Sequence, residues 1–368
     1  MKIDDKKSLK SPSLRFPEFT GEWKNTTLEE CVDFLDGQRK PIKSDDRKGE
    51  KRLYPYYGAS GIIDYIDEYI FDGDYILLSE DGANIIDRNY RVAFIANGKI
   101  WVNNHAHVLQ PHKEMNINFL SEALERINYA IYNTGTTMPK LNQEICRKIN
   151  LNVPSLSEQN KIGNLLYLLN ERIATQNRLI EKLQSLIGGI AQHCIKEAIS
   201  GSMGIKLGDI CKITTGKLDA NAQVDNGLYP FFTCAEQPFK IDNFAFDTEA
   251  LLISGNGANL GYVNYYNGKF NAYQRTYVLD AFSENIQYIK WALKVLLPKR
   301  IAIEKSSSNT PYIVLSTLSD LRLPIPSKGN QCHMAELMQS LERKLSNQIA
   351  LKSSYNMLKQ YLLRQMFI

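Results

Sequence analysis

The sequence lacks the features that mark membrane and disulfide-rich proteins. No apolar run approaches the roughly 20 residues that a membrane helix needs, and no apolar signal-peptide core follows the lysine-rich start. Six cysteines are scattered without a Cys-x-x-Cys pair, a pattern typical of reduced thiols rather than of a disulfide framework. We therefore expect a cytoplasmic protein that makes no contact with a membrane.

Charge of one sign and methyltransferase motifs are also scarce. The formal net charge of +4 permits a nucleic-acid partner but does not identify one, because a mixed solvated surface gives the same figure. The Asn-Pro-Pro-aromatic and Asp-Pro-Pro-Tyr motifs of adenine methyltransferases do not occur in the sequence. Composition alone thus leaves the function open.

What the sequence does contain is a long internal repeat. LEECVDFLDGQRK (residues 28–40) returns as LGDICKITTGKLD (207–219), and FDGDYILLSEDGAN (71–84) returns as FDTEALLISGNGANL (246–260). Further pairs follow in the same order, among them Tyr54-Pro55 with Tyr229-Pro230, Pro154 with Pro326, and Gln159 with Gln331. A repeat of roughly 170 residues is far longer than solenoid periods, so each copy should be a domain with its own core.

Each copy has the pattern of a small α/β domain. Short β-rich runs, such as 75–79 and 251–254, are separated by glycine and asparagine, and helical spacing occurs at 117–132 and near 286–297. The sequence therefore predicts an N-terminal arm (1–22), a first domain (23–156) and a second domain (201–326).

A helical segment with a coiled-coil pattern follows each domain. Residues 157–200 contain no proline, and Ser157 with Glu158 suggests a helix start. Apolar residues fill two heptad positions in 157–200 and again in 327–368. Gln176 and Gln348 interrupt the same position, where a polar residue can fix register and partner. We predict two spacer helices that pair with each other; two independent surface helices are the alternative.

The candidates for catalysis are weak. The loop GNGANLG (255–261) could let a backbone approach a phosphate or adenosylmethionine, but the first copy has SEDGAN there. Asp74 and Glu80 lack the lysine that a nuclease would place two residues further on. His105 and His107 could share a strand face, yet two histidines without further ligands are a poor zinc site. We predict no catalytic residue, no metal and no cofactor.

The order of these features resembles the DNA-specificity subunit of type I restriction-modification systems. The resemblance rests on LRFPEFTGEW (14–23), the domain starts at Leu28 and Leu207, and PSLSEQNKI (154–162) entering a long helix, with its echo at 326–331. It covers essentially the whole chain. One departure is that the second copy lacks a counterpart of Glu158, which weakens the helix start there.

The resemblance implies a non-catalytic subunit with internal pseudo-twofold symmetry. Two target recognition domains would each read one half of a split, asymmetric site in double-stranded DNA. The helices would form an antiparallel coiled coil that sets the spacing and docks two methyltransferase subunits, and two restriction subunits with motor and nuclease activity would complete a restriction enzyme. The alternatives are a related methyltransferase system without restriction subunits, a self-contained enzyme dependent on adenosylmethionine, and a coiled-coil scaffold that binds protein.

Polar residues in the loops are the candidates for reading DNA. Base edges are read by Arg, Lys, Asn, Gln, Ser and Thr, whereas phosphates are held by basic side chains and hydroxyls. The first copy offers Gln38, Arg39, Lys40, Tyr57, Asn84, Arg88, Arg91, Asn104, His105, Thr137 and Lys140. The second copy offers Thr215, Lys217, Asn256, Asn259, Gln274, Arg275, Ser308 and Asn309.

Structural roles remain open for several of these residues. Asn84 and Asn259 follow Gly-Ala and could serve turn geometry instead, and the basic residues could belong to a solvated surface. The paired aromatics at 56–57 and 231–232 fit a core better than a stacking platform. The copies keep their glycines and apolar strands but exchange polar candidates, for example His105 for Arg275. Such differences favour two readers of unlike half-sites.

Overall fold

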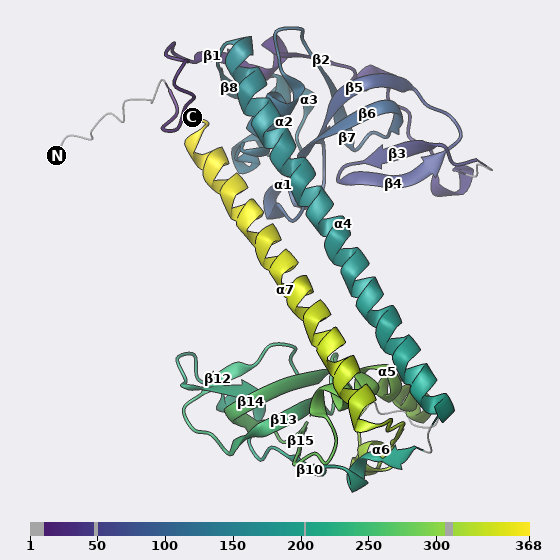
Figure 1. Cartoon of the computed structure of the whole chain (residues 1–368). Helices are drawn as coiled ribbons and strands as arrows, with labels where there is room; N and C mark the ends of the chain where they lie inside the picture. Colours follow the sequence, from purple (N-terminus) through teal and green to yellow (C-terminus); the bar gives the residue numbers. More distant parts are fainter. Residues whose placement is uncertain (1–10, 48–50, 202–203, 306–311) are drawn as a thin grey trace, which may run out of the picture. The chain divides into compact units, whose positions relative to one another are not determined.

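The computed structural model describes residues 11–47, 51–201, 204–305 and 312–368 (Figure 1). The chain forms two compact units, Met1–Asn177 with Leu351–Ile368 and Arg178–Ala350. Each unit contains part of two long helices, α4 (Leu156–Gly201) and α7 (Lys328–Gln365). No helix of the described segments is long and apolar enough to cross a membrane.

The first unit is built on a six-stranded mixed sheet. Its strand order is β2-β7-β5-β6-β3-β4, in which β3 and β6 are parallel and all other neighbours are antiparallel. A separate pair, β1 (Lys24–Thr27) with β8 (Asn150–Val153), joins the start and the end of the domain. The strands of the sheet are β2 (Val32–Phe34), β3 (Tyr54–Gly58), β4 (Gly61–Ile66), β5 (Phe71–Ser79), β6 (Ala93–Val102) and β7 (Ala106–Pro111).

The second unit repeats this sheet strand for strand. Its order is β10-β15-β13-β14-β11-β12, again with one parallel pair, β11 and β14. A short pair, β9 (Ile205–Lys206) with β16 (Arg322–Leu323), corresponds to β1 and β8. The expected tandem duplication of α/β domains is therefore confirmed. The strands are β10 (Lys212–Thr215), β11 (Tyr229–Phe232), β12 (Phe239–Ile241), β13 (Phe246–Ser254), β14 (Val263–Ala272) and β15 (Thr276–Asp280).

The central strand of each sheet is buried on both faces. Successive side chains of a strand point to opposite faces, so a continuous apolar run can serve two cores. In β5, Ile76 and Leu78 pack toward the helices, whereas Tyr75 and Leu77 fill a second core on the other face. In β13 the residues 250–253 divide in the same way. The apolar run YILLS thus contributes side chains to the cores on both faces of the sheet.

Short helices cover one face of each sheet, and two of them differ in length from the sequence prediction. The helix predicted for 117–132 ends at Glu125, because Asn128 adopts an extended conformation and its side chain accepts from the Ala130 N–H. The helix predicted for 286–297 continues through Pro298 to Lys305, where burial of Ile301 in the core favours the extra turns. The helices of the domains are α1 (Asn84–Asp87), α2 (Ile117–Glu125), α3 (Gln143–Arg147), α5 (Ile286–Lys305) and α6 (Leu315–Ser319).

One buried glutamine fastens each domain to the long helix that follows it. Gln159 of α4 accepts a hydrogen bond from the backbone N–H of Asn116 at 2.9 Å and donates to the Pro154 carbonyl at 3.0 Å. Gln331 of α7 makes the same two contacts, with Asn285 at 3.0 Å and Pro326 at 2.9 Å. Both asparagines cap the domain helices α2 and α5. The joint is therefore the same in both units.

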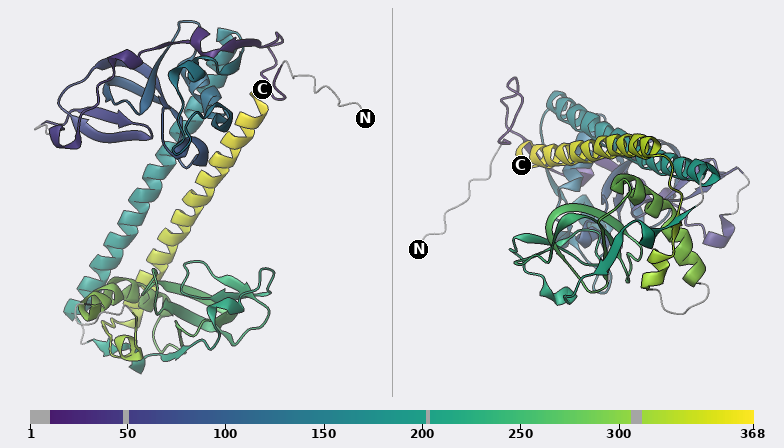
Figure 2. Two further views of the ribbon diagram at one scale, coloured as in Figure 1. Left: turned by 180° about the vertical axis from the view of Figure 1, so that it is seen from behind. Right: turned by 60° about the horizontal axis from the view of Figure 1, so that its bottom comes forward.

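The two long helices pack against each other in opposite directions within each unit (Figures 1 and 2). In the first unit the beginning of α4 packs on the end of α7, and in the second unit the end of α4 packs on the beginning of α7. Apolar residues make these contacts, as the heptads predict. They include Ile162, Leu166 and Leu169 with Leu362 and Met366 in the first unit, and Ile187 and Ala191 with Met334 and Met338 in the second.

Two details of the helices refine the sequence interpretation. Helix α4 begins at Leu156, because Ser155, not Ser157, is its cap: the Ser155 hydroxyl accepts from the Glu158 N–H at 3.4 Å. Gln176 is buried, with 6% of its side chain exposed, and Gln348 is half-buried. A role of these two glutamines in setting the register stays a prediction.

We predict that replacing Leu166 by Ala lowers the free energy of unfolding by about 2–5 kcal/mol, because it removes a fully buried side chain from the seam. Leu168 is 56% exposed on the same helix, so Leu168→Ala is the matched control and should change stability by about 0.5 kcal/mol or less. Denaturant unfolding of both variants measures the difference. Equal effects would contradict the assignment of Leu166 to the seam.

Candidate nucleic-acid interface

In the first unit, several loops meet around the turn between β6 and β7. The Glu80 N–H donates to the His105 carbonyl at 2.9 Å, and the Asn103 N–H donates to the Tyr57 carbonyl at 3.1 Å. The segment 133–141 joins them, since the Leu141 N–H donates to the Glu80 carbonyl at 2.7 Å. The Trp101 indole N–H also donates a hydrogen bond to the Lys40 carbonyl at 2.6 Å. The loops that carry most of the predicted polar residues are thus neighbours.

The second unit builds the same turn between β14 and β15. The Gly255 N–H donates to the Arg275 carbonyl at 2.8 Å, and the Tyr273 N–H donates to the Phe232 carbonyl at 2.9 Å. These bonds correspond to those of Glu80 and Asn103 in the first unit. The Gln274 N–H donates to the Leu218 carbonyl at 2.9 Å, which brings the loop of Thr215 and Lys217 close. Shared backbone bonds therefore present unlike side chains in the two units.

An ion-pair network lies beneath the turn of the first unit. The Arg39 guanidinium pairs with Glu80 at 2.7 Å and donates to the Ala106 carbonyl at 2.8 Å. His107 is buried, with Nδ1 2.6 Å from an Asp36 carboxylate oxygen and Nε2 2.8 Å from the Leu141 carbonyl. Lys140 lies 3.5 Å from Glu80. The network ties the segment 36–40 to the adjacent loops.

The charge of His107 follows from its two partners. A carbonyl and a carboxylate both accept hydrogen bonds, so each ring nitrogen must carry a proton. Burial lowers the pKa of His107, but hydrogen bonds with Asp36 and Cys146 and the charge of Asp36 outweigh it and raise that pKa to about 10. Burial raises the pKa of Asp36, yet the partnership with His107 holds it below its ordinary value. The pair is an imidazolium and a carboxylate.

Asp36, Glu80 and His107 are the one group of possible metal ligands within the described residues. A histidine binds a metal through a neutral nitrogen, and neither nitrogen of His107 is available. Arg39 also occupies the position between the two carboxylates. His105 does not share a strand face with His107, since it lies in the turn before β7 and is exposed. The residues present thus fit an ion-pair network better than a metal.

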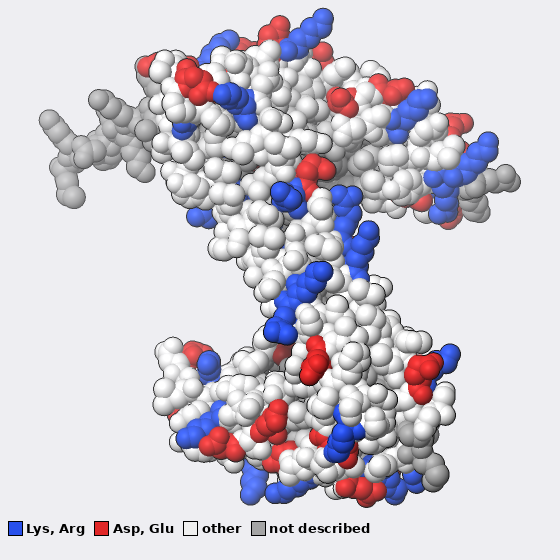
Figure 3. All heavy atoms as spheres, in the orientation of Figure 1, with Lys and Arg blue, Asp and Glu red and all other residues white. Residues whose placement is uncertain are grey.

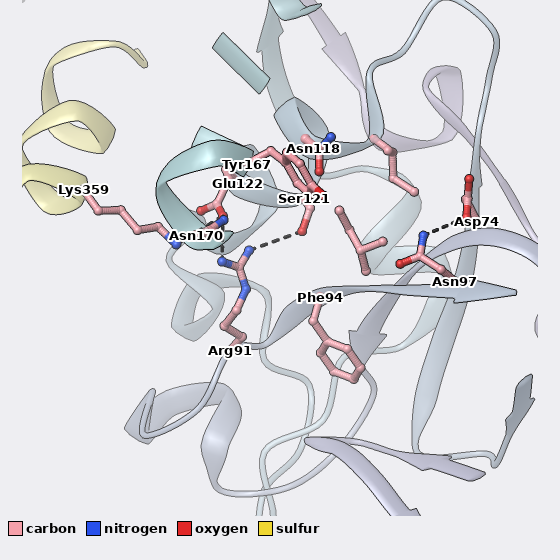
Figure 4. Close-up of a pocket in the computed structure, with 12 residues that line it drawn as sticks. Asp74, Arg91, Phe94, Asn97, Asn118, Ser121, Glu122, Tyr167, Asn170 and Lys359 are labelled. Carbon is pink, nitrogen blue, oxygen red and sulfur yellow. Dashed lines mark hydrogen bonds and ion pairs between the residues drawn. The ribbon is translucent and has the colours of Figure 1, made fainter. Parts of the chain in front are cut away.

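Arg88 and Arg91 lie against α2, where carboxylates hold both. Arg88 pairs with Glu125 at 2.9 Å. Arg91 pairs with Glu122 at 2.7 Å (Figure 4). Burial raises the pKa of Glu122, but Arg91 and Lys359 outweigh it and keep that pKa below its usual value. Arg91, Glu122 and Lys359 border a cavity of about 680 Å³. To reach DNA, either arginine would have to give up its ion pair.

Other predicted residues serve their own loops. Asn84 bridges the N–H and the carbonyl of Tyr90, and the Asn259 amide donates to the Cys234 carbonyl at 3.0 Å. In the loop 255–261, a Cβ on Gly255 would lie 2.4 Å from the Arg275 carbonyl, so the close approach of the turn requires glycine. Asn256, in the same loop, is half-buried. Packing thus accounts for Gly255 without a cofactor.

The aromatic residues divide as their positions on the strands dictate. Tyr56, Phe231 and Phe232 are buried in the cores, which agrees with the core interpretation. Tyr57 is half-buried with its ring 6.1 Å from that of Phe94, and burial raises the pKa of Tyr57. Tyr57 therefore keeps one part accessible beside the turn.

The remaining predicted residues are exposed around the two turns. Among the residues that the structure describes, no acidic side chain pairs with Lys40, Lys217 or Arg275. His105 pairs with Asp81 at 2.8 Å. Lys and Arg are interspersed with Asp and Glu on the face shown in Figure 3, as the small net charge suggests. Ser308 and Asn309 lie outside the described residues, and the exposed set is Gln38, Lys40, Asn104, His105, Thr137, Lys140, Thr215, Lys217, Gln274 and Arg275.

Sequence reasoning missed the residues that position these loops. Asp36, Glu80 and His107 come from three separate segments, and their pairing depends on the sheet order. Only one signal was available: Asp36 is three residues before Arg39, and a carboxylate at that spacing can hold the arginine. The sequence offered no comparable signal for Glu122 or Glu125, which are more than 30 residues from their arginines.

The fold defines a class of protein with a duplicated α/β domain and two long helices. Two sheets of one strand order present polar loops that differ between the copies. A family model described as the type I restriction modification DNA specificity domain matches residues 20–185 and 200–352. These matches cover most of the chain, so the chain belongs to this family and the resemblance seen in the sequence is confirmed.

Known relatives agree with the family. The chain is 42% identical over 137 residues to the EcoDI type I restriction enzyme specificity subunit of Escherichia coli. The matched residues make up 37% of this chain but only 30% of that protein. It is 24% identical over 329 residues to a putative type I specificity subunit of Mycoplasma pneumoniae, covering 84% and 87% of the two chains. The crystal structure of a type I restriction-modification S subunit from M. genitalium has a TM-score of 0.74 at 19% identity, over 97% and 99% of the chains. That likeness shows the fold.

We predict that His107 makes the stability of the first unit dependent on pH. Because the folded-state pKa of about 10 exceeds the ordinary 6.5, the stabilisation is complete below pH 6.5 and is lost as the pH rises toward 10. Wild type should lose on the order of 3 kcal/mol more than His107→Gln over that interval, in denaturant unfolding at several pH values. The half-buried His112, which lies outside this network, serves as control, and His112→Gln should follow wild type. Parallel curves for wild type and His107→Gln would contradict the imidazolium.

Proposed function

We propose that the chain is the DNA-recognition subunit of a type I restriction-modification complex, in which each domain reads one half of a bipartite, asymmetric site. The observation that carries the proposal is the pair of matched turns, at 103–105 and 273–275, which share backbone bonds but differ in side chains. Membership in the DNA specificity family supports DNA as the partner. Two identical readers would suit a palindrome, whereas these two suit unlike half-sites.

The proposal assigns two roles to the predicted residues. The exposed set around the turns contacts base edges and phosphates, because its side chains are accessible and, apart from His105 and Lys140, form no ion pair with a described acidic residue. Arg39, Arg88 and Arg91 hold the loops in place through Glu80, Glu125 and Glu122. Asn84 and Asn259 close their own loops, and Tyr57 and Asn256 remain accessible in part beside the turns. The sequence specificity for DNA then depends on a small number of exposed side chains, on loops that the ion pairs hold in place.

The long helices would set the spacing of the half-sites and dock two methyltransferase subunits. Their solvent-facing sides carry large apolar residues, which favours a protein partner along the helices. In the first unit Tyr167 and Leu168 of α4 are 46% and 56% exposed, and Met357 and Tyr361 of α7 are 63% and 55% exposed. In the second unit Leu186 and Ile349 are 50% and 48% exposed. Adenine methylation would come from the docked subunits, and restriction subunits would join where the system has them.

Two of the three other readings make different predictions for the same experiments. A methyltransferase system without restriction subunits would give the same DNA reading. A self-contained enzyme dependent on adenosylmethionine would need the loop 255–261 for its cofactor, and packing against the turn already explains Gly255 there. In a scaffold that binds only protein, substitutions of exposed loop residues would leave DNA specificity unchanged.

We predict that Arg275→Ala relaxes or weakens the reading of one half-site only, by about 1–3 kcal/mol at the affected base. Arg275 is exposed and no described acidic side chain pairs with it, so its loss should not disturb the fold. Methylation of DNA libraries with randomised half-sites, by the complex with its methyltransferase subunits, measures the effect. Lys40→Ala is the reciprocal control and should affect the other half-site. Equal loss on every sequence would assign Arg275 to a phosphate and contradict a reading role.

We predict that lengthening both helices changes the permitted gap between the half-sites. One heptad inserted after Gln176 and one after Gln348 preserve the seam and add about 10 Å, or about three base pairs. The methylated sites should keep both half-site sequences while their gap widens. The same heptad residues substituted in place, without insertion, provide the control. A gap preference that stays the same in the lengthened chain would refute the spacer role.

A further inference from the structure

The N-terminal arm of the first unit is anchored on a buried carboxylate. Both nitrogens Nε and Nη2 of Arg15 lie 2.7 Å from the two carboxylate oxygens of Glu158. The Trp23 indole N–H also donates to Glu158, at 3.3 Å, and the Glu158 side chain is 1% exposed. This bidentate, charge-assisted contact is among the stronger ones that a surface segment can make.

Apolar and aromatic contacts complete the arm site. The Trp23 ring packs edge-on against Phe119 of α2 and Phe367 beyond α7, with centroids 5.8 and 6.2 Å apart. The Leu14 N–H donates to the Gln365 carbonyl at 2.9 Å. The Lys161 ammonium lies 5.4 Å from the ring centroid of Phe16. The arm thus covers the place where α2, the start of α4 and the end of α7 meet.

The second unit has a cavity at the corresponding place. The shared glutamine joints align the units, so Phe119, Glu158, Lys161 and Gln365 correspond to Tyr288, Asn330, His333 and His193. All four counterparts line one cavity of about 500 Å³, together with Pro326, Met334 and Leu337. Glu197 of α4 is an exposed carboxylate at the same cavity. The cavity therefore repeats the walls of the arm site.

Among the described residues, no counterpart of the arm precedes the sheet of the second unit. In the first unit the arm is a separate segment before β1, whereas in the second unit α4 ends at Gly201 and β9 begins at Ile205. Three residues between them are too few to form a counterpart of the segment 14–23. The described residues of the second unit therefore leave this cavity open to an occupant from another molecule.

We propose that this cavity of the second unit is a docking site for an extended peptide segment of a partner protein. The segment would present an aromatic or apolar side chain to Tyr288 and Met334, as Trp23 does to Phe119, and a cation toward Glu197 and Asn330. The site is distinct from the turns that the proposed function assigns to DNA. A test without DNA therefore leaves that function unaffected if it fails.

The probe is a fluorescent peptide of residues 11–24, SPSLRFPEFTGEWK, titrated into the full chain and followed by anisotropy. The peptide should bind wild type at one site. Ala198→Trp, which fills the cavity, should weaken binding at least tenfold, while circular dichroism confirms that the variant is folded. Glu158→Asn removes the carboxylate that anchors the chain's own arm in the first unit. It tests whether the peptide binds there in place of the arm, and it should leave peptide binding at the second unit unchanged.

A gain of function gives the sharper measurement. Asn330→Glu restores the carboxylate that Glu158 supplies in the first unit, and the position follows the cap Ser327, where Glu also suits the helix start. Binding should tighten about tenfold, because a charged hydrogen-bond pair is gained. A peptide with Ala in place of Arg15 should lose that gain.

Three results would overturn the proposal. The first is no binding to either wild type or Asn330→Glu. The second is binding that Glu158→Asn alters and Ala198→Trp does not, which would place the peptide in the first unit. The third is self-association of the full-length Asn330→Glu chain in sedimentation velocity that is lost with Arg15→Ala, which would assign the cavity to the arm of a second copy.

Discussion

The buried glutamine joint is the contact that holds each domain on its long helix. Gln159 and Gln331 each hold the capped start of a domain helix against a long helix, and both side chains are almost fully buried. A buried amide that lost one of these bonds would cost about 1–3 kcal/mol, so the joint has little freedom to shift. Close packing adds to it in the first unit, where a Cβ on Gly163 would lie 2.3 Å from the Asn116 side chain. The orientation of each sheet on its helix follows from this joint.

The duplication distinguishes the structural features that both units share from the side chains that differ between them. Strand order, the glutamine joint and the backbone bonds of the β6–β7 and β14–β15 turns are the same in both units. The side chains on these turns are not. His105 stands where Arg275 does, and the network of Arg39, Asp36 and His107 has no counterpart at Leu218. A shared frame with different loops gives the two units different surfaces.

Features of the fold that repeat along the chain or follow a heptad period could be predicted from the sequence. The duplication, the heptad seam and the pairing of Pro154 and Gln159 with Pro326 and Gln331 could all be found from letters alone, although the role of the glutamines as joints could not. Contacts between distant segments could not be predicted from the sequence. Arg91 was a candidate for DNA binding, but the structure pairs it with Glu122. The absence of Glu158 from the second copy looked like a weaker helix start. Its structural meaning, an anchor for the arm through Arg15, depends on a contact across 143 residues.

We propose that one chain reads two unlike DNA half-sites separated by a fixed gap. Mapping every methylated adenine in DNA from cells that express this chain with its methyltransferase tests it most directly. The account predicts a single two-part sequence, with unlike halves and an unspecified gap of constant length between them. Methylation at a continuous or palindromic sequence, or without sequence preference, would contradict it.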